Sequence, residues 1–321
     1  MSLLIGVDLG ATKVRVALGN ESGIRASCYE KTDKNHSASG IIDQIARMIR
    51  SLLPENSFPG TIGIGSIGPL DLSSGSIREP PNLPFRFIPL KAPLEEEFGV
   101  SVCLMNDCTA AVLGEHTFGA ARGSENVVYV TISTGIGGGA LVDGHLLIGK
   151  DGNAVEAGHI TVDPEGTMTC GCGCRGHWEA YCSGANIPNY TRYLLSRRDP
   201  EDWSTSLLKQ FSGGDPQHIT AEILFKAAKK GDKVSKWIVE RIGELNALGF
   251  ADLINLFDPE LITVGGSVAL NNPDLILEPI LRNIRKHAIN RVPEIRITPL
   301  GDEVVLYGAL ALAYRRVAGC E

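Results

Sequence analysis

An acidic residue followed by a glycine and a hydroxyl near the start of the chain could hold a metal and a phosphate. In Asp8-Leu-Gly10-Ala-Thr12-Lys13, Asp8 follows an apolar strand predicted over Leu3–Val7. A carboxylate at a strand end can bind Mg²⁺ through water, and the glycine lets backbone amides approach phosphate oxygens. The same residue types also form ordinary hairpin turns, so this pattern alone leaves both interpretations open.

A second glycine-rich run follows the strand predicted over Val127–Ile132. We expect a bend over Ser133–Gly139 and a hairpin turn at Asp143-Gly144. The bend could wrap an anion with its backbone amides, or be only a flexible connection. Because a hairpin rather than a helix follows, the run is not a Rossmann fingerprint.

Asn106-Asp107 stands at the end of a short buried strand predicted over Val102–Met105. A carboxylate beside a bound hydroxyl compound can accept the proton of the attacking hydroxyl in phosphoryl transfer. The alternative is a helix cap, because Asn and Asp are favoured before a helix and one is expected over Thr109–Thr117. Local sequence favours the cap.

Cysteines and histidines gather between residues 159 and 177. Cys170, Cys172 and Cys174 alternate with glycines, and His159 and His177 flank them. Thiolate and imidazole are the ligands that tetrahedral Zn²⁺ prefers. The pattern predicts a zinc site in this segment. Four protein ligands leave no open position, so the zinc is expected to be structural.

The spacing of apolar residues predicts the helices and strands that hold these groups. The apolar spacing from Ile42 to Leu52 predicts a helix that Ser39 could cap, and Thr61–Ile64 reads as a strand. Long helices are expected over 220–256, a strand over Leu261–Val264 before Gly265-Gly266, and a final helix over Val304–Val317. A strand, glycine-rich turn and second strand open both halves, which indicates two related lobes.

Composition excludes several classes of protein. The 321 residues carry a formal charge of −7 without a Lys/Arg-rich run, which argues against a nucleic-acid surface. No segment is apolar enough for a membrane helix, and the N-terminus lacks the basic flank of a signal peptide. Eight cysteines with this clustering favour metal binding in a reducing compartment, and we expect a soluble cytoplasmic protein.

Together these motifs resemble those of the ROK family (repressor, open reading frame, kinase) of the actin-like superfamily. Ile5 to Lys13 and Thr134 to Gly138 look like its two phosphate motifs, and Gly265-Gly266 its adenosine-side motif. Asn106-Asp107 matches the family's Asn-Asp. The resemblance implies an α/β, two-lobed actin-like (ribonuclease H-like) ATPase fold, with nucleotide and sugar in the interlobe cleft. It implies a smaller lobe of residues 1–108 plus about 305–321, and a larger lobe of 109–304 with the zinc loop.

The resemblance also implies roles for single residues. Asp107 would be the catalytic base, and the sugar would contact Asn82, Asn106, Asp107, Glu156, His159 and Glu179. ATP would contact Asp8, Gly10, Thr12, Lys13, Thr134, Gly135, Gly137, Gly138, Gly265 and Gly266, with Asp8 near Mg²⁺ through water. His159 would bind zinc through one ring nitrogen and face the sugar with the other. One departure is His177, which stands where the family motif has its last cysteine. The resemblance then implies the zinc ligands His159, Cys170, Cys172 and His177, with Cys174 as the rival fourth ligand.

The activity implied is transfer of phosphate from ATP to a hexose, with glucose as the first choice. An N-acetylmannosamine kinase or another ROK hexose kinase is the alternative. A sugar-sensing repressor would carry a winged-helix module ahead of Asp8, for which only seven residues leave no room. An actin-like chaperone or filament ATPase would not need Glu156, His159 and Glu179. No nucleic-acid or membrane partner is expected, and the family's habit suggests a homodimer or homotetramer.

Overall fold

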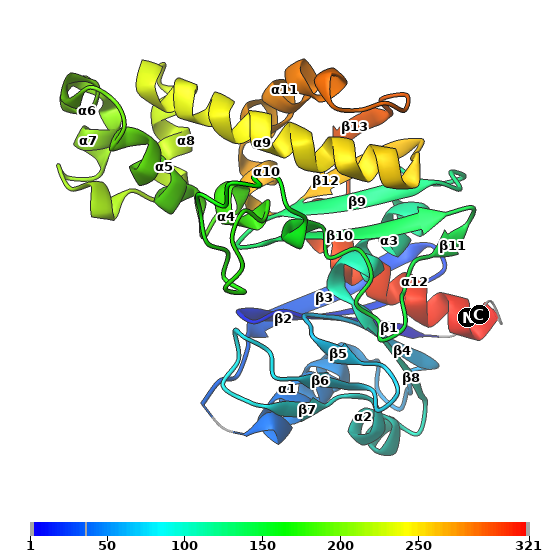
Figure 1. Cartoon of the computed structure of the whole chain (residues 1–321). Helices are drawn as coiled ribbons and strands as arrows, with labels where there is room; N and C mark the ends of the chain where they lie inside the picture. Colours follow the sequence, from blue (N-terminus) through cyan, green and yellow to red (C-terminus); the bar gives the residue numbers. More distant parts are fainter. Residues whose placement is uncertain (1–2, 36, 319–321) are drawn as a thin grey trace. The chain divides into compact units, whose positions relative to one another are not determined.

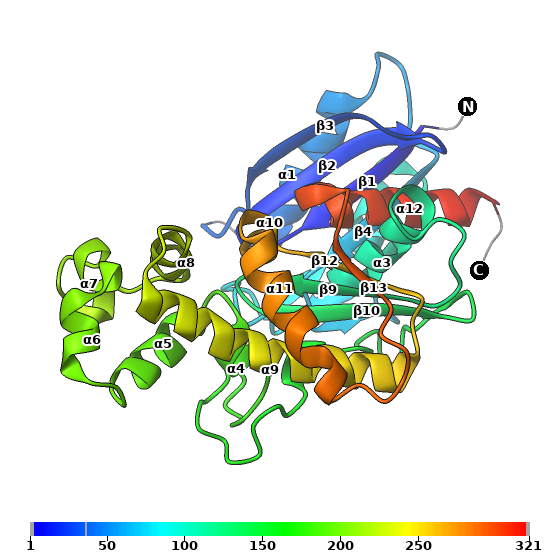
Figure 2. The ribbon, with the colours of Figure 1, turned by 90° about the horizontal axis from the view of Figure 1, so that it is seen from above.

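The computed structural model describes residues 3–35 and 37–318 and divides the chain into two compact units (Figures 1 and 2). Unit 1 contains the chain up to Tyr129, then Gly139–Val155 and the residues from Thr298 on. Unit 2 contains Val130–Gly138 and Glu156–Ile297. Strands β9 (Val127–Ile132) and β10 (Ile136–Val142) each pass from one unit into the other.

A five-stranded sheet forms the centre of unit 1. Its strands, in the order β3-β2-β1-β4-β8, are Gly23–Lys31, Lys13–Asn20, Leu4–Leu9, Thr61–Ser66 and Ser101–Asn106. β1 runs antiparallel to β2 and parallel to β4, and β4 runs parallel to β8. The central strands β1 and β4 are buried almost throughout, which explains their continuous apolar sequence. A small second sheet has the order β5-β6-β7, with strands Leu70–Asp71, Ser76–Arg78 and Phe87–Pro89.

Helices pack against the large sheet of unit 1. They are α1 (Ala38–Leu52), α2 (Lys91–Phe98), α3 (Asp107–Phe118) and α12 (Val304–Ala318), which follows the short η4 (Gly301–Glu303). α1 buries one apolar stripe against β2 and β3, as helical spacing requires. α12 packs closely on β1, β4 and α3 because glycines face it: a Cβ on Gly63 would lie 2.0 Å from the carbonyl oxygen of Ala309.

The second five-stranded sheet has the order β11-β10-β9-β12-β13. β11 is His145–Leu146, β12 is Leu261–Gly265 and β13 is Glu294–Ile297, and β12 runs parallel to β13. The long helix α9 (Lys233–Phe257) packs against α11 (Pro273–Asn283) and α8 (Ala221–Lys229). The other helical elements of unit 2 are η1 (Ala157–His159), α4 (Glu179–Cys182), α5 (Ile187–Leu195), α6 (Pro200–Thr205), α7 (Leu207–Phe211), η2 (Pro216–His218), α10 (Ser267–Asn271) and η3 (Ile284–Lys286).

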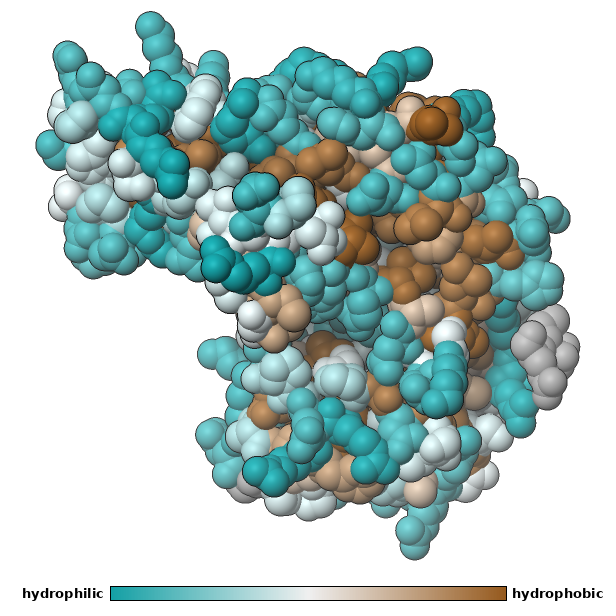
Figure 3. Space-filling model, in the orientation of Figure 1, coloured by the Kyte–Doolittle hydropathy of each residue, from teal (hydrophilic) through white to brown (hydrophobic). Residues whose placement is uncertain are grey.

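The surface over helices α6 to α8 is largely polar, as Figure 3 shows, and α6 has no buried residue. In the described part of the chain, every helix is too short or too polar to span a lipid bilayer.

Most predicted elements are confirmed, and four details are wrong. Asp8 and Leu9 belong to β1 rather than to a turn, α1 begins after Ser37 rather than Ser39, and β3 was not predicted. The glycine bend covers only Ser133–Gly135, because Gly137 to Gly139 are paired within β10. Gly139 serves close packing instead: a Cβ there would lie 2.2 Å from the carbonyl oxygen of Cys108.

The units differ from the expected lobes, because unit 1 also contains residues 109–129, Gly139–Val155 and 298–304, which were expected in the larger lobe. The C-terminal helix α12 is grouped with the N-terminal strands, as the expected smaller lobe has it. α3, expected in the larger lobe, is grouped with unit 1. The reason is its packing on α12, where a Cβ on Gly114 would lie 2.7 Å from the carbonyl oxygen of Val304.

Candidate active site

Asp8 is a nearly buried carboxylate near the end of β1. Its side chain is 13% exposed, and its Oδ2 lies 3.1 Å from Nη1 of Arg15 on β2. Burial raises the pKa of Asp8 to about 6, the positive charge of Arg15 opposes this, and the negative charge of Asp107 adds to it. Asp8 and Asp107 therefore lie near enough to interact, and two hard oxygen donors suit Mg²⁺.

Asp107 begins α3, directly after the cap residue Asn106. The side-chain oxygen of Asn106 accepts hydrogen bonds from the amides of Cys108 (2.9 Å) and Thr109 (3.3 Å). Oδ1 of Asp107 also accepts from the Cys108 amide, at 2.7 Å. Asn106 is therefore the cap residue of α3, and Asp107 accepts one further hydrogen bond from the Cys108 amide. Burial raises the pKa of Asp107, while the hydrogen bonds from the backbone oppose the rise.

One loop of unit 1 adds a residue that sequence reasoning missed. A Cβ on Gly68 would lie 3.9 Å from Nδ2 of Asn106 and 3.8 Å from Oδ1 of Asn153. Asn153 therefore lies in the neighbourhood of Asn106, although no local sequence signal marks it. Asn82 is exposed in a turn, and its carbonyl oxygen accepts from Nζ of Lys34 at 3.1 Å. Within the described residues no contact joins Asn82 to Asn106 or Asp107.

The predicted phosphate turn in unit 1 is a tight, internally bonded bend. The Gly10 amide donates to the Lys13 carbonyl oxygen (2.9 Å), and the Thr32 amide donates to that of Thr12 (3.0 Å). A Cβ on Gly10 would lie 3.1 Å from the same Lys13 oxygen, which favours glycine there. The side chain of Thr12 is exposed, and the ammonium of Lys13 lies 5.3 Å from the ring centre of Tyr29.

The other predicted phosphate residues meet within unit 2. Ser133 and Thr134 at the bend accept backbone hydrogen bonds from Gly184 (2.7 Å) and Ala185 (3.1 Å). Gly266 has a φ of 85°, and a Cβ there would lie 2.5 Å from the carbonyl oxygen of Ile132. The bend and the start of α10 are thus neighbours, and only glycine fits at 266.

Glu179 connects the cysteine loop to this bend. Its Oε2 accepts a hydrogen bond from the Ile136 amide at 2.9 Å, and its Oε1 lies 3.5 Å from Sγ of Cys170. A Cβ on Gly135 would lie 2.5 Å from Oε2 of Glu179. Glycine at position 135 therefore leaves room for the Glu179 carboxylate in this position, a function that the phosphate interpretation did not include.

The residues before the cysteine loop also lie against Ile136. A Cβ on Gly158 would lie 2.2 Å from the Ile136 carbonyl oxygen, so η1 can approach the bend only with glycine at that position. This places His159 beside the cysteine loop. Glu156 precedes η1 with an exposed side chain, and its carbonyl oxygen accepts from the His159 amide at 3.0 Å.

Four side chains form a compact group with the dimensions of a zinc site. One ligand atom from each of His159, Cys170, Cys172 and His177 lies within 4.8 Å of the other three. The two histidine Nδ1 atoms are 3.3 Å apart, and the sulfur-to-Nδ1 distances are 3.7 Å for Cys170–His159 and 3.4 Å for Cys172–His177. A tetrahedral zinc has edges of about 3.4 Å between nitrogens and about 3.5 Å between nitrogen and sulfur. The donor set fits the metal, and exposed Cys174 is outside it.

Trp178 anchors this loop to α9. Its indole is fully buried and donates to Oδ1 of Asn246 at 2.8 Å. Gly249 makes room for the ring, because a Cβ there would lie 2.4 Å from it. His177 and Glu179, on either side of Trp178, are therefore fixed by a core side chain.

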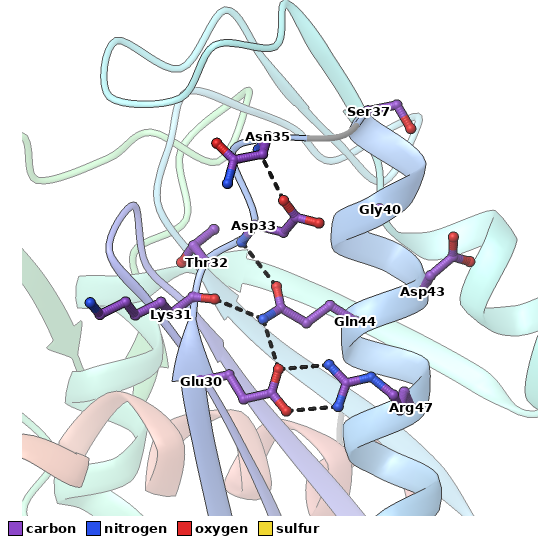
Figure 4. A pocket seen from close by; sticks show the side chains of 10 residues that line it. All are labelled: Glu30, Lys31, Thr32, Asp33, Asn35, Ser37, Gly40, Asp43, Gln44 and Arg47. Carbon is purple, nitrogen blue, oxygen red and sulfur yellow. Dashed lines mark hydrogen bonds and ion pairs between the residues drawn. The ribbon is translucent and has the colours of Figure 1, made fainter.

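A pocket of about 730 Å³ between β3 and α1 holds none of the predicted site residues (Figure 4). Glu30 and Arg47 form two contacts of 2.7 Å, and Gln44 donates to Glu30 and to the Lys31 carbonyl oxygen. These polar groups hydrogen-bond to one another, so few of their donors and acceptors remain for a ligand.

Comparison with known proteins gives a consistent result. Residues 4–316 match the model of the ROK family. A glucokinase of Pyrobaculum calidifontis is 36% identical over 98% of this chain and 96% of its own. The structure of a ROK family glucokinase from Streptomyces griseus with glucose and AMPPNP is 33% identical, with a TM-score of 0.79 over 98% of this chain and all of that chain. A ROK hexokinase from Thermus thermophilus is 32% identical, with a TM-score of 0.82 and 99% coverage of both chains.

Proposed function

The chain belongs to the ROK family and has its actin-like fold, and on this premise we propose that it transfers the γ-phosphoryl group of ATP to the primary hydroxyl of glucose. The observation that carries the proposal is Asp107, a partly buried carboxylate at the start of α3 with a raised pKa and a neighbouring Asn106. Relatives named glucokinase support glucose, and the Streptomyces griseus structure holds glucose with an ATP analogue.

Asp107 would accept the proton of the sugar hydroxyl as its oxygen attacks the γ-phosphorus in line with the leaving ADP. Positioning and charge stabilisation supply most of the catalysis in such transfers. Asp8 would hold Mg²⁺ through water, and Gly10, Thr12 and Lys13 would contact phosphate from unit 1. In unit 2, the bend around Thr134 and Gly135, with Gly137, Gly138, Gly265 and Gly266, would contact the nucleotide. Asn82, Asn106, Glu156, His159 and Glu179 would contact sugar hydroxyls.

We also propose that His159, Cys170, Cys172 and His177 hold a structural zinc ion. The ion would fix the conformation of the loop, because protein atoms would occupy all four of its coordination positions. The Nδ1 atom of His159 faces the other ligands, which leaves its Nε2 for the sugar. The ion would set the orientation of that ring.

Three further features are part of the proposal. The enzyme would work in the cytoplasm as a homodimer or homotetramer, and it would bind neither nucleic acid nor membrane. The formal charge of −7 supports the absence of nucleic-acid binding.

Substitution of Asp107 tests the base directly. Asp107→Asn keeps the size of the side chain but cannot accept the proton, so kcat should fall by about 10²–10⁴-fold with little change in sugar affinity. Asp274→Asn is the matched control, because Asp274 is exposed in the first turn of α11. A near-normal kcat for Asp107→Asn would remove Asp107 from the mechanism.

The substrate is tested by a coupled assay of ADP release with glucose, mannose, fructose, N-acetylglucosamine and N-acetylmannosamine. We expect the highest kcat/KM with glucose. Preference for N-acetylmannosamine would replace glucose with the alternative substrate. A rate of ADP release that does not change when any of these sugars is added would contradict the proposed function.

A further inference from the structure

Arg15 faces the metal-binding carboxylate across two strands. In the antiparallel pairing of β1 and β2, Asp8 lies directly opposite Arg15. Directly opposed side chains project from the same face of the sheet and meet. The Arg15 side chain is only 20% exposed, so water screens this pair less than it screens a surface ion pair.

The guanidinium of Arg15 is itself held in place. Nη1 donates to the backbone oxygen of Asp302 at 2.6 Å, and Nη2 lies 2.7 Å from Oδ2 of Asp302. Asp302 belongs to η4, immediately before α12. Two strands and the start of the C-terminal helix thus fix the position of one positive charge.

We propose that Arg15 is a positioning residue that orients the Asp8 carboxylate for the magnesium of the bound nucleotide. The inference rests on the proposed function, because that function assigns Mg²⁺ to Asp8. Arg15 contacts Oδ2 of Asp8, which leaves Oδ1 for a water molecule on the metal. A planar guanidinium fixed at three points imposes an orientation that a flexible ammonium cannot.

The negative charge of Asp107 supplies a second argument for this function of Arg15. The charged groups that act on Asp8 are Arg15, Asp107 and Asp302. Without Arg15, the two acidic neighbours would repel Asp8, and its side chain would be free to turn. The function of Arg15 therefore concerns the metal rather than the nucleotide alone.

The experiment measures ADP binding by calorimetry with and without Mg²⁺, in the wild type and in Arg15→Met. In the wild type, Mg²⁺ should strengthen ADP binding. In Arg15→Met this strengthening should fall about tenfold, as expected for loss of one charge-assisted contact, while the affinity for metal-free ADP stays unchanged. Arg15→Lys should recover only part of the effect. Arg47→Met is the control, because Arg47 pairs with Glu30 on the same sheet away from Asp8.

The outcomes separate three functions for Arg15. An unchanged effect of Mg²⁺ in Arg15→Met would overturn the proposal, and so would equal weakening of metal-free ADP, which would indicate direct nucleotide contact. If Arg15→Met does not fold, Asp302→Ala provides the test: it removes one anchor of the guanidinium and should reduce the effect of Mg²⁺ about threefold. No reduction would again contradict the proposal.

Failure of the proposed function would be recognised separately. If the wild type phosphorylates no hexose but its binding of Mg²⁺ and ADP depends on Arg15, the sugar assignment falls and the inference stands. If the wild type phosphorylates glucose while Arg15→Met shows an unchanged effect of Mg²⁺, the inference falls and the proposed function stands.

Discussion

Asp107 experiences two opposing influences, and their balance predicts a pH dependence. Burial raises its pKa above the ordinary 3.8, whereas the Cys108 amide and other donors lower it. The base works only when ionised, so activity is lost as the pH falls through this raised pKa. We expect the acid limb of a kcat/KM profile to lie above pH 3.8. An acid limb at or below that pH would show that another group controls the reaction.

Single residues differ in how far their sequence context predicts them. The proposed zinc ligands could be predicted as a group, because alternating cysteines with flanking histidines favour few metals, and the four side chains lie together in the structure. Arg15 and Asn153 could not be identified from the sequence. Arg15 meets Asp8 only because of the strand register, and Asn153 approaches Asn106 only because two loops distant in the chain lie together. His177 lies in the same group as the other proposed zinc ligands, and its imidazole suits zinc as a thiolate does.

At the scale of elements, apolar periodicity predicted α1, α9 and α12 because each has one face buried against a sheet or another helix. The glycines were harder to interpret. Gly137 to Gly139 look like part of a loop in the sequence, but pairing within β10 makes them extended. Gly158 is needed for its close contact with the Ile136 backbone, and Gly135 leaves room for the Glu179 carboxylate. A single sequence cannot distinguish these uses of glycine from flexibility.

The connection between α1 and β3 depends on Gln44 more than on its charged neighbours (Figure 4). Gln44 is 8% exposed, donates to Glu30 and the Lys31 carbonyl oxygen, and accepts from the Asp33 amide at 3.1 Å. Gln44→Ala leaves these groups without their partner, so the free energy of unfolding should fall by about 1–3 kcal/mol in urea titrations.

Arg47→Ala is the matched control for Gln44→Ala, one turn further along α1. Its ion pair with Glu30 is exposed, so its loss should change the free energy of unfolding by about 0–1 kcal/mol. The prediction would be wrong if Arg47→Ala destabilised the protein more than Gln44→Ala does.

At the scale of the whole molecule, each unit combines segments that are far apart in the chain. Unit 1 joins the first strands to the last helix, and unit 2 contains the bend at 133–135 together with Glu156–Ile297. The resemblance predicted the return of the C-terminal helix to the N-terminal strands, whereas hydrophobic pattern alone could not have done so. Within unit 1, α3 packs on α12 through glycines such as Gly114, which the hydrophobic pattern does not predict.

All four proposed zinc ligands lie in unit 2, which predicts a selective effect of metal removal on stability. A ligand that binds only the folded state stabilises it, so dialysis against a chelator should lower the unfolding temperature of unit 2 and leave that of unit 1 nearly unchanged. Calorimetry together with zinc analysis measures both effects. Cys172→Ser should lose the metal and reproduce the chelated state, whereas Cys174→Ser should retain about one zinc per chain, because four other protein atoms complete its tetrahedron. Loss of zinc in Cys174→Ser would show that Cys174 rather than His177 is the fourth ligand, and full zinc content in Cys172→Ser would contradict the proposed site.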